Sequence, residues 1–131
     1  MPATSSPTRL RTEWELLQGA WRSVAGPCEA RLLIVGDYFS FEFLDGDIYI
    51  GTFVLTPEGM DMHILAGPAE HRGQTALCLY RVEGGVLQWS AGRPGSNRRP
   101  CCFPEVDDPR ALSFVFRRDR RPLRRWRPRS S

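Results

Sequence analysis

The chain has 131 residues, with 18 basic and 15 acidic side chains and a formal net charge of +3, which is the size of a single domain. No run of residues approaches the ~20 apolar positions that a membrane helix needs, so the sequence predicts no membrane span. Residues 1–7 lack the apolar segment of a secretory signal, so we expect a cytoplasmic protein. No phosphate loop, nucleophile motif or paired carboxylates are evident, so we expect no cofactor and favour a protein that is not an enzyme.

Charge is unevenly distributed along the chain. Every basic residue is arginine, which together with 12 glycines and 11 prolines is typical of a GC-rich genome. Residues 117–131 carry eight arginines and one aspartate, a charge of +7, whereas residues 1–116 carry ten arginines and 14 acidic residues, a charge of −4. The sequence therefore predicts a mildly acidic body and a strongly basic tail.

The N-terminal part predicts one short helix. Residues 1–10 are rich in proline, serine and threonine and are expected to be disordered. Residues 11–19 fit a helix that Thr12 caps, with Glu15 completing a capping box and Gly19 ending the helix.

The remainder predicts short strands separated by turns and loops. Phe39, Phe41 and Phe43 alternate with polar residues, the pattern of a half-buried strand, and Gly51 indicates a bulge in the strand that follows. Residues 66–74 predict a polar loop, and residues 92–110 predict a long loop with a short edge segment near Cys102 and Phe103. The expected strands are Trp21–Val24, Ala30–Val35, Tyr38–Phe43, Asp47–Leu55, Met60–Leu65, Thr75–Val82, Val86–Ala91 and Ala111–Arg117.

Short connections of this kind predict an antiparallel architecture. Strands joined by turns are antiparallel neighbours, and closing about eight of them into an up-and-down barrel removes the exposed edges. A two-sheet sandwich is the alternative. The sequence thus predicts an all-β barrel with a short N-terminal helix over residues 11–118, followed by a disordered arginine-rich tail over residues 119–131.

A series of short motifs carries a family resemblance. They are Leu17-Gln18-Gly19-Ala20-Trp21, Gly36-Asp37-Tyr38-Phe39, Gly51-Thr52-Phe53-Val54-Leu55, Met60-Asp61-Met62, Leu79-Tyr80, Gly84-Gly85-Val86-Leu87, Arg99-Pro100 with Phe103, and Phe114-Val115-Phe116-Arg117-Arg118. Gly19-Ala20-Trp21 is similar to the Gly-x-Trp that opens the first strand of lipocalin-type barrels. The whole series resembles a family of small uncharacterised domains, abundant in bacterial genomes of the planctomycetes and described as lipocalin-like. The resemblance covers residues 13–118 and implies a lipocalin-like β-barrel without an established activity.

The resemblance also implies how one end of the barrel is closed. An arginine from the last strand, Arg117 or Arg118, would cover Trp21, a cation–π contact worth ~0.5–2 kcal/mol. A binding site would then lie at the opposite, open end, ringed by the loops at residues 66–74 and 92–110.

Large apolar side chains are predicted to face the interior. They form either the wall of a cavity for a small apolar ligand or a filled core, and their bulk favours a mostly filled core. The residues that such a ligand would contact are Phe39, Phe41, Phe43, Met62, Tyr80 and Trp89.

Catalytic and metal chemistry have weaker signals. Asp61 and His63 share a strand face and can act as an acid–base pair, although two solvent-facing side chains are the simpler interpretation. Cys101 and Cys102, with Cys28 and a histidine, offer Zn²⁺ ligands but lack the usual chelating spacing, so we predict four free thiols and no metal site. Neighbouring arginines are expected to lower the pKa of the two adjacent thiols.

The basic tail offers a different kind of partner. Residues 117–129 combine arginines with Trp126, which suits an acidic partner or nucleic acid, although a solvated terminus without a role is the simpler interpretation. The sequence thus favours a binding module for a small apolar ligand at the open barrel end. The alternative is a protein- or nucleic-acid-interaction module that uses its surface and this tail, and no oligomeric state is predicted.

Overall fold

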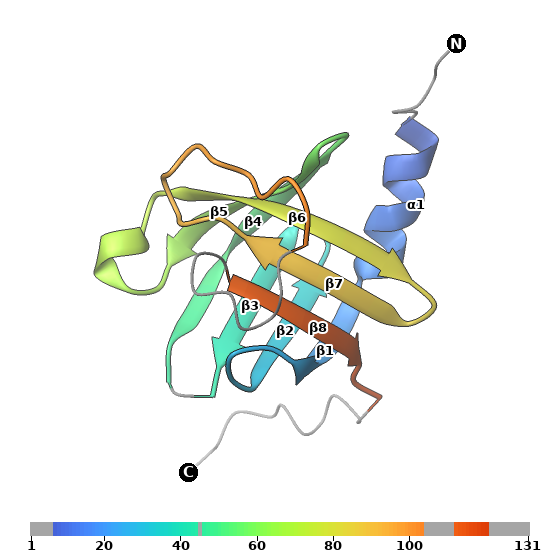
Figure 1. The fold of residues 1–131 in the computed structure, drawn as a ribbon, viewed down its shortest axis with the longest axis horizontal. Helices are drawn as coiled ribbons and strands as arrows, with labels where there is room; N and C mark the ends of the chain where they lie inside the picture. Colours follow the sequence, from blue (N-terminus) through green and yellow to red (C-terminus); the bar gives the residue numbers. More distant parts are fainter. Residues whose placement is uncertain (1–6, 45, 104–111, 121–131) are drawn as a thin grey trace.

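The strands form one closed, antiparallel barrel in the computed structural model, which describes residues 7–44, 46–103 and 112–120 (Figure 1). Each strand pairs with the next in sequence, and β8 returns to pair with β1. The predicted up-and-down barrel of eight strands with a short N-terminal helix is confirmed. The elements are α1 (Pro7–Leu17), β1 (Gly19–Ala25), β2 (Ala30–Val35), β3 (Tyr38–Phe43), β4 (Ile48–Thr56), β5 (Gly59–Ala66), the 3₁₀ helix η1 (Ala69–His71), β6 (Thr75–Glu83), β7 (Val86–Ala91) and β8 (Leu112–Arg118).

Alternation of apolar and polar side chains explains why the strands close around a core. Phe39 and Phe41 of β3 are buried, while Ser40 between them is not. In β8, Phe114 and Phe116 are fully buried, and Arg117, the next residue, is exposed. Burying one large apolar side chain contributes about 1.5–3 kcal/mol, so the interior face of each strand holds the barrel together.

Two glycine positions shape the barrel. Gly84 and Gly85 have φ angles of 61° and 78°, the left-handed pair that a tight turn between β6 and β7 requires. Gly51 lies at a register shift between β4 and β5, where an added Cβ would stand 1.8 Å from the carbonyl oxygen of His63. The bulge predicted at Gly51 is therefore confirmed.

The helix begins earlier than the sequence predicted. It covers Pro7–Leu17, so residues 7–10 are helical and Thr12 lies inside the helix, which makes the predicted capping box wrong. Proline suits the first turn of a helix, where its missing N–H leaves no bond unmade. Two ion pairs then link successive turns: Arg9 with Glu13, and Arg11 with Glu15.

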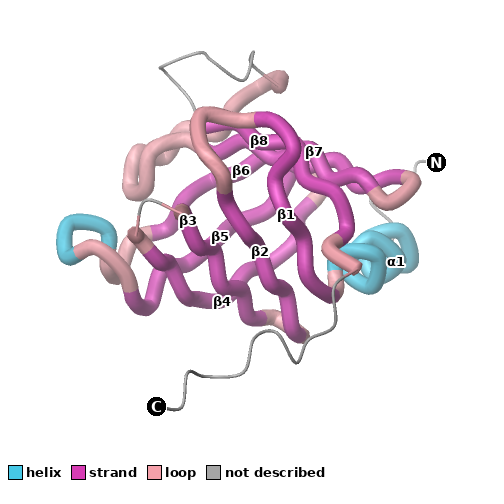
Figure 2. The backbone as a smooth tube through the Cα atoms, turned by 90° about the horizontal axis from the view of Figure 1, so that it is seen from below, coloured by secondary structure: helices cyan, strands magenta, loops and turns pink. Residues whose placement is uncertain are grey.

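Helix α1 covers one end of the barrel. It packs against β4 and β6, with Leu17 fully buried, and the indole N–H of Trp14 donates to Asp37 Oδ1 at 2.9 Å. Figures 1 and 2 place α1 and η1 on opposite sides of the barrel, so η1 marks the end away from the helix. No helix of the described residues has the length and apolar character for a membrane crossing.

The connection after β7 runs along the first residues of β6 in its described part and reaches the loop that precedes β6, where Gly95 lies beside Gln74. Residues 92–103 turn back over β6, where the Gly95 N–H donates to the Thr75 carbonyl at 3.0 Å. Arg99 donates to the carbonyl of Cys78, also on β6, at 2.9 Å. These bonds hold the segment against β6, and Arg99 also reaches Asp61 of β5.

The remaining loop predictions have mixed outcomes. The loop predicted over residues 66–74 covers residues 67–74, because Ala66 ends β5, and it contains η1. There His71 Nδ1 is hydrogen-bonded to the Tyr49 hydroxyl at 2.8 Å. The predicted edge segment near Cys102 is wrong, because residues 101–103 are bends and pair with no strand. Residues 104–111 lie outside the described part of the chain.

Candidate anion-binding site

The interior residues predicted to bind a ligand pack mainly against one another. Phe41 lies in the middle, with its ring centroid 4.8 Å from those of Phe43 and Trp89. The rings of Phe114 and Phe116 follow at 5.6 and 5.7 Å. Stacked and tilted rings at these distances are ordinary core packing. The buried members of the predicted set are Phe39, Phe41, Met62 and Trp89.

Phe43 and Tyr80 lie towards opposite ends of the barrel. Phe43 is half-buried near the open end, with its ring 5.8 Å from Tyr49. Tyr80 points to the helix end, where its hydroxyl donates to Glu13 Oε1 at 2.5 Å. Burial raises the pKa of the Tyr80 phenol, and the hydrogen bond to Glu13 raises it further. The predicted ligand residues therefore do not line a single mouth.

Asp61 and His63 do not act on each other. Asp61 Oδ1 accepts a hydrogen bond from Arg99 at 2.7 Å, an ion pair with both side chains partly buried. His63 Nδ1 is hydrogen-bonded to the Thr75 hydroxyl at 3.1 Å. The Asp61–Arg99 bond fastens the segment after β7 to β5, so a structural role accounts for the carboxylate.

The cysteines do not form a reactive or metal-binding group in the described residues. All four are free thiols, as predicted, and no three potential ligands there lie close enough to hold a metal ion. Burial raises the pKa of the Cys78 thiol far above its usual value. Cys102 is exposed, and hydrogen bonding to the Cys101 thiol raises its pKa. The predicted lowering of the pKa by neighbouring arginines is therefore wrong for Cys102.

Arg118 covers Trp21 at the helix end of the barrel. The two residues are cross-strand partners, and the Arg118 guanidinium carbon lies 4.3 Å from the centre of the indole ring. The guanidinium also donates to the carbonyls of Leu16 and Gln18 at the end of α1. Partial burial lowers the pKa of Arg118, although an arginine stays charged at any physiological pH. Arg118 thus joins β8, β1 and the helix.

Arg117 points the other way and meets a second arginine. Because side chains alternate along a strand, Arg117 faces outward where Arg118 faces the barrel end. Its cross-strand partner is Arg22 of β1, and both side chains are exposed. Like charges directly opposite on neighbouring strands destabilise a sheet. The fold therefore gains nothing from placing these two guanidinium groups together.

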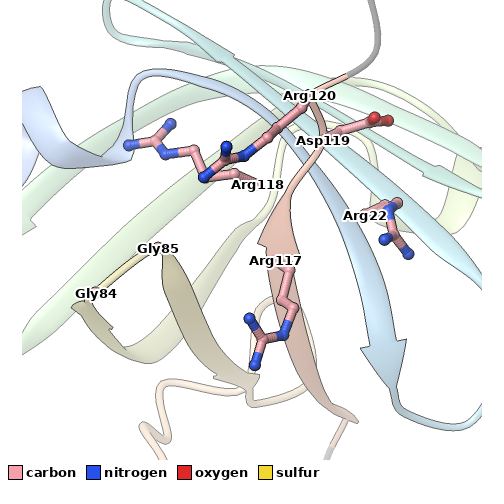
Figure 3. A pocket seen from close by; sticks show the side chains of 7 residues that line it. All are labelled: Arg22, Gly84, Gly85, Arg117, Arg118, Asp119 and Arg120. Atoms are coloured by element: carbon pink, nitrogen blue, oxygen red, sulfur yellow. The ribbon is translucent and has the colours of Figure 1, made fainter.

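An open hollow of about 820 Å³ surrounds this pair (Figure 3). Figure 3 shows Arg22 on one side of Arg117 and the turn between β6 and β7 on the other. The chain beyond β8 stays attached to β1, because the Asp119 N–H donates to the Ala20 carbonyl at 2.9 Å. The lining residues are Arg22, Gly84, Gly85, Arg117, Arg118, Asp119 and Arg120.

Three of the lining arginines have guanidinium groups without a partner in the part of the chain that the structure describes. We call Arg22, Arg117 and Arg120 the arginine face. Within the described residues their guanidinium groups make no ion pair or hydrogen bond, whereas Arg118 is bound to the helix. Asp119 is the one carboxylate among the seven lining residues, so positive charge prevails. Such a group of guanidinium forks is suited to binding an anion.

The sequence pointed to one part of this site and missed the rest. Residues 117–129 were predicted to meet an acidic partner, and the described residues 117–120 include Arg117 and Arg120 of the arginine face. Arg22 was missed, although it directly follows Trp21 and therefore had to lie beside Arg117 once Arg118 lay beside Trp21. Residues 121–129 lie outside the described part.

Comparison of the chain with protein-family models, curated proteins and solved structures finds no match. The lipocalin-like family resemblance therefore stays a prediction from the motifs, and the function is argued from the site alone.

Proposed function

We propose that the protein is a non-catalytic module that binds a polyanionic partner through the arginine face. The observation that carries this proposal is the cross-strand pair of Arg22 and Arg117, exposed and without carboxylate partners among the described residues. Two facing guanidinium groups repel each other in the free protein. A bound anion removes that repulsion, so binding and stability are coupled at this point.

The charge pattern of the chain supports the same function. Beyond Arg120 the sequence supplies five more arginines up to residue 129, while residues 1–116 carry a net charge of −4. Concentrated positive charge beside an acidic body attracts and orients an acidic partner.

The test is binding of a fluorescent polyanion at low and at physiological salt. We expect the natural sequence to bind with an affinity that falls steeply as salt rises, because counterions are released. The variants Arg22→Glu and Arg117→Glu are expected to weaken binding by roughly tenfold or more each, since each reverses one charge in the site.

Arg72→Glu is the matched control, because Arg72 is an exposed arginine in the loop between β5 and β6, away from the arginine face. It makes the same change in net charge. If Arg72→Glu weakens binding as much as Arg117→Glu, net charge alone accounts for the affinity and the arginine face is not the site.

A small apolar ligand at the open barrel end is the second candidate. It is favoured by the indole N–H of Trp89, which is buried inside the barrel without a hydrogen bond of ordinary geometry. The Cys78 sulfur, whose pKa the indole lowers slightly, is only a weak acceptor. We place this candidate second because a ligand there would have to displace the rings packed on Phe41. Native mass spectrometry of the protein purified from its host tests it, and a ligand-free mass contradicts it.

A further inference from the structure

The composition of the hollow narrows the class of anion. Its lining consists of arginines, glycines and one aspartate, and it contains neither an aromatic ring nor an aliphatic side chain. Proteins that read bases in single strands stack them on aromatic side chains. An anion held at this lining is therefore recognised by its charged groups, and any base or apolar part that it carries stays in solvent.

The placement of the arginines favours phosphate over carboxylate. Arg22 and Arg117 are directly opposite on neighbouring antiparallel strands, which sets their Cβ atoms about 5 Å apart. A carboxylate is planar, and its roughly four lone-pair sites lie in that plane, so a second guanidinium fork can reach it only within the plane. A phosphate in a polymer carries its two non-bridging oxygens on a tetrahedral phosphorus, so two forks that approach from different directions can each reach an oxygen of the same phosphate.

The hollow has room for an extended ligand on the side of the turn between β6 and β7. Gly84 and Gly85 carry no side chains, and a Cβ built on either meets nothing within 4 Å. The wall on the β6–β7 side is therefore low, and Arg120 continues the arginine face where the chain leaves β8. A chain of phosphates can therefore pass through the hollow between Arg22, Arg117 and Arg120.

We infer that the arginine face binds the backbone of a phosphate polymer without reading bases. This inference rests on the proposed polyanion-binding function and names its ligand class. The shared chemistry is a row of phosphate groups, which either a nucleic acid or inorganic polyphosphate supplies.

The experiment is a competition assay on the full chain with a labelled oligo-dT of about 16 nucleotides, the upper end of the usual single-strand site. The competitors are oligo-dA, inorganic polyphosphate and poly-L-glutamate of matched charge. We expect oligo-dA to compete within about threefold of oligo-dT and polyglutamate to be at least tenfold weaker, since phosphate contacts carry no sequence information. Competition by polyphosphate equal to that of oligo-dA assigns the affinity to phosphate alone. Weak competition by polyphosphate assigns it to the nucleic acid backbone, and both results support the inference.

Other results overturn it in distinguishable ways. Equal competition by polyglutamate removes the preference for phosphate but leaves a polyanion-binding module. A preference of more than about tenfold between oligo-dT and oligo-dA indicates base reading, which the lining does not provide. Failure of every polyanion to bind refutes the proposed function itself.

A conservative variant separates geometry from charge. Replacing Arg22 and Arg117 by lysine, as Arg22→Lys with Arg117→Lys, keeps the net charge and removes both forks. We expect this variant to lose at least about fivefold in affinity for oligo-dT and to lose the preference for phosphate over polyglutamate. An unchanged preference contradicts the role of the two forks.

Discussion

Reversing the charge of Arg117 is expected to make the protein more stable while it weakens polyanion binding. Arg117 faces Arg22 across the strand pair, so Arg117→Glu replaces a repulsive pair with an attractive one. Two unit charges about 8 Å apart in a water-like dielectric interact by roughly 0.5 kcal/mol, and the change of sign shifts the pair energy by roughly 1 kcal/mol. Screening over a Debye length of ~8 Å at physiological salt reduces this gain to about 0.4 kcal/mol.

Thermal denaturation at low and high salt measures the gain. For a domain of this size about 0.4 kcal/mol raises Tm by roughly 2 °C. The gain is expected to grow at low salt and to vanish near ~1 M salt, where the Debye length is ~3 Å. Arg117→Gln is the matched variant: it removes the repulsion without adding an attraction, so it should give about half of the gain. A lower Tm for Arg117→Glu at low salt, or a gain that does not depend on salt, would refute the reasoning.

The other predictions concern the helix end of the barrel and the thiols. Trp21→Ala is expected to lower the free energy of unfolding by about 3–5 kcal/mol, because it truncates a buried indole. Urea unfolding of this variant should find no folded baseline. An unchanged midpoint would contradict the role of Trp21 in closing the barrel. Arg118→Lys keeps the charge but loses the two hydrogen bonds to the carbonyls of Leu16 and Gln18, so we expect the free energy of unfolding to fall by about 1–2 kcal/mol. An unchanged unfolding midpoint would show that these bonds contribute nothing. The pKa of Tyr80 is raised in the folded state, so the folded protein keeps the phenol proton at a pH where the unfolded chain loses it. Stability therefore falls as pH rises above the unfolded pKa of ~10. Tyr80→Phe should remove that part of the fall, and an identical pH profile would contradict the assignment. Labelling with a thiol reagent should modify the three exposed cysteines and spare Cys78 until the protein unfolds; equally fast labelling of all four would contradict its burial.

Much of the fold follows from local patterns in the sequence. The alternation of Phe39, Phe41 and Phe43 and the turn glycines predicted the strands, because one face of each strand had to be buried and each short link forced an antiparallel neighbour. The start of α1 was missed, since the capping pattern at Thr12 competed with a proline that tolerates the first turn equally well.

The candidate site was harder to predict, because it depends on register between distant strands. Nothing near Arg22 in the sequence marks it as functional. It becomes part of the candidate site only because β8 pairs with β1 and places Arg117 opposite it. The course of the segment after β7 likewise depends on a contact between distant residues. Arg99 binds Asp61, 38 residues earlier in the chain, and no local pattern predicts that partner.

The salt dependence of oligonucleotide binding tests the arginine face most directly. Each phosphate contact contributes about 0.9 to the slope of log K against log salt for duplex DNA and about 0.7 for a single strand. Because Arg22 and Arg117 share one phosphate, replacing both by alanine should reduce the slope by about 0.9 for duplex or about 0.7 for single-stranded DNA. Arg72→Ala should leave the slope unchanged. A slope that stays the same in the double variant would contradict binding at the arginine face.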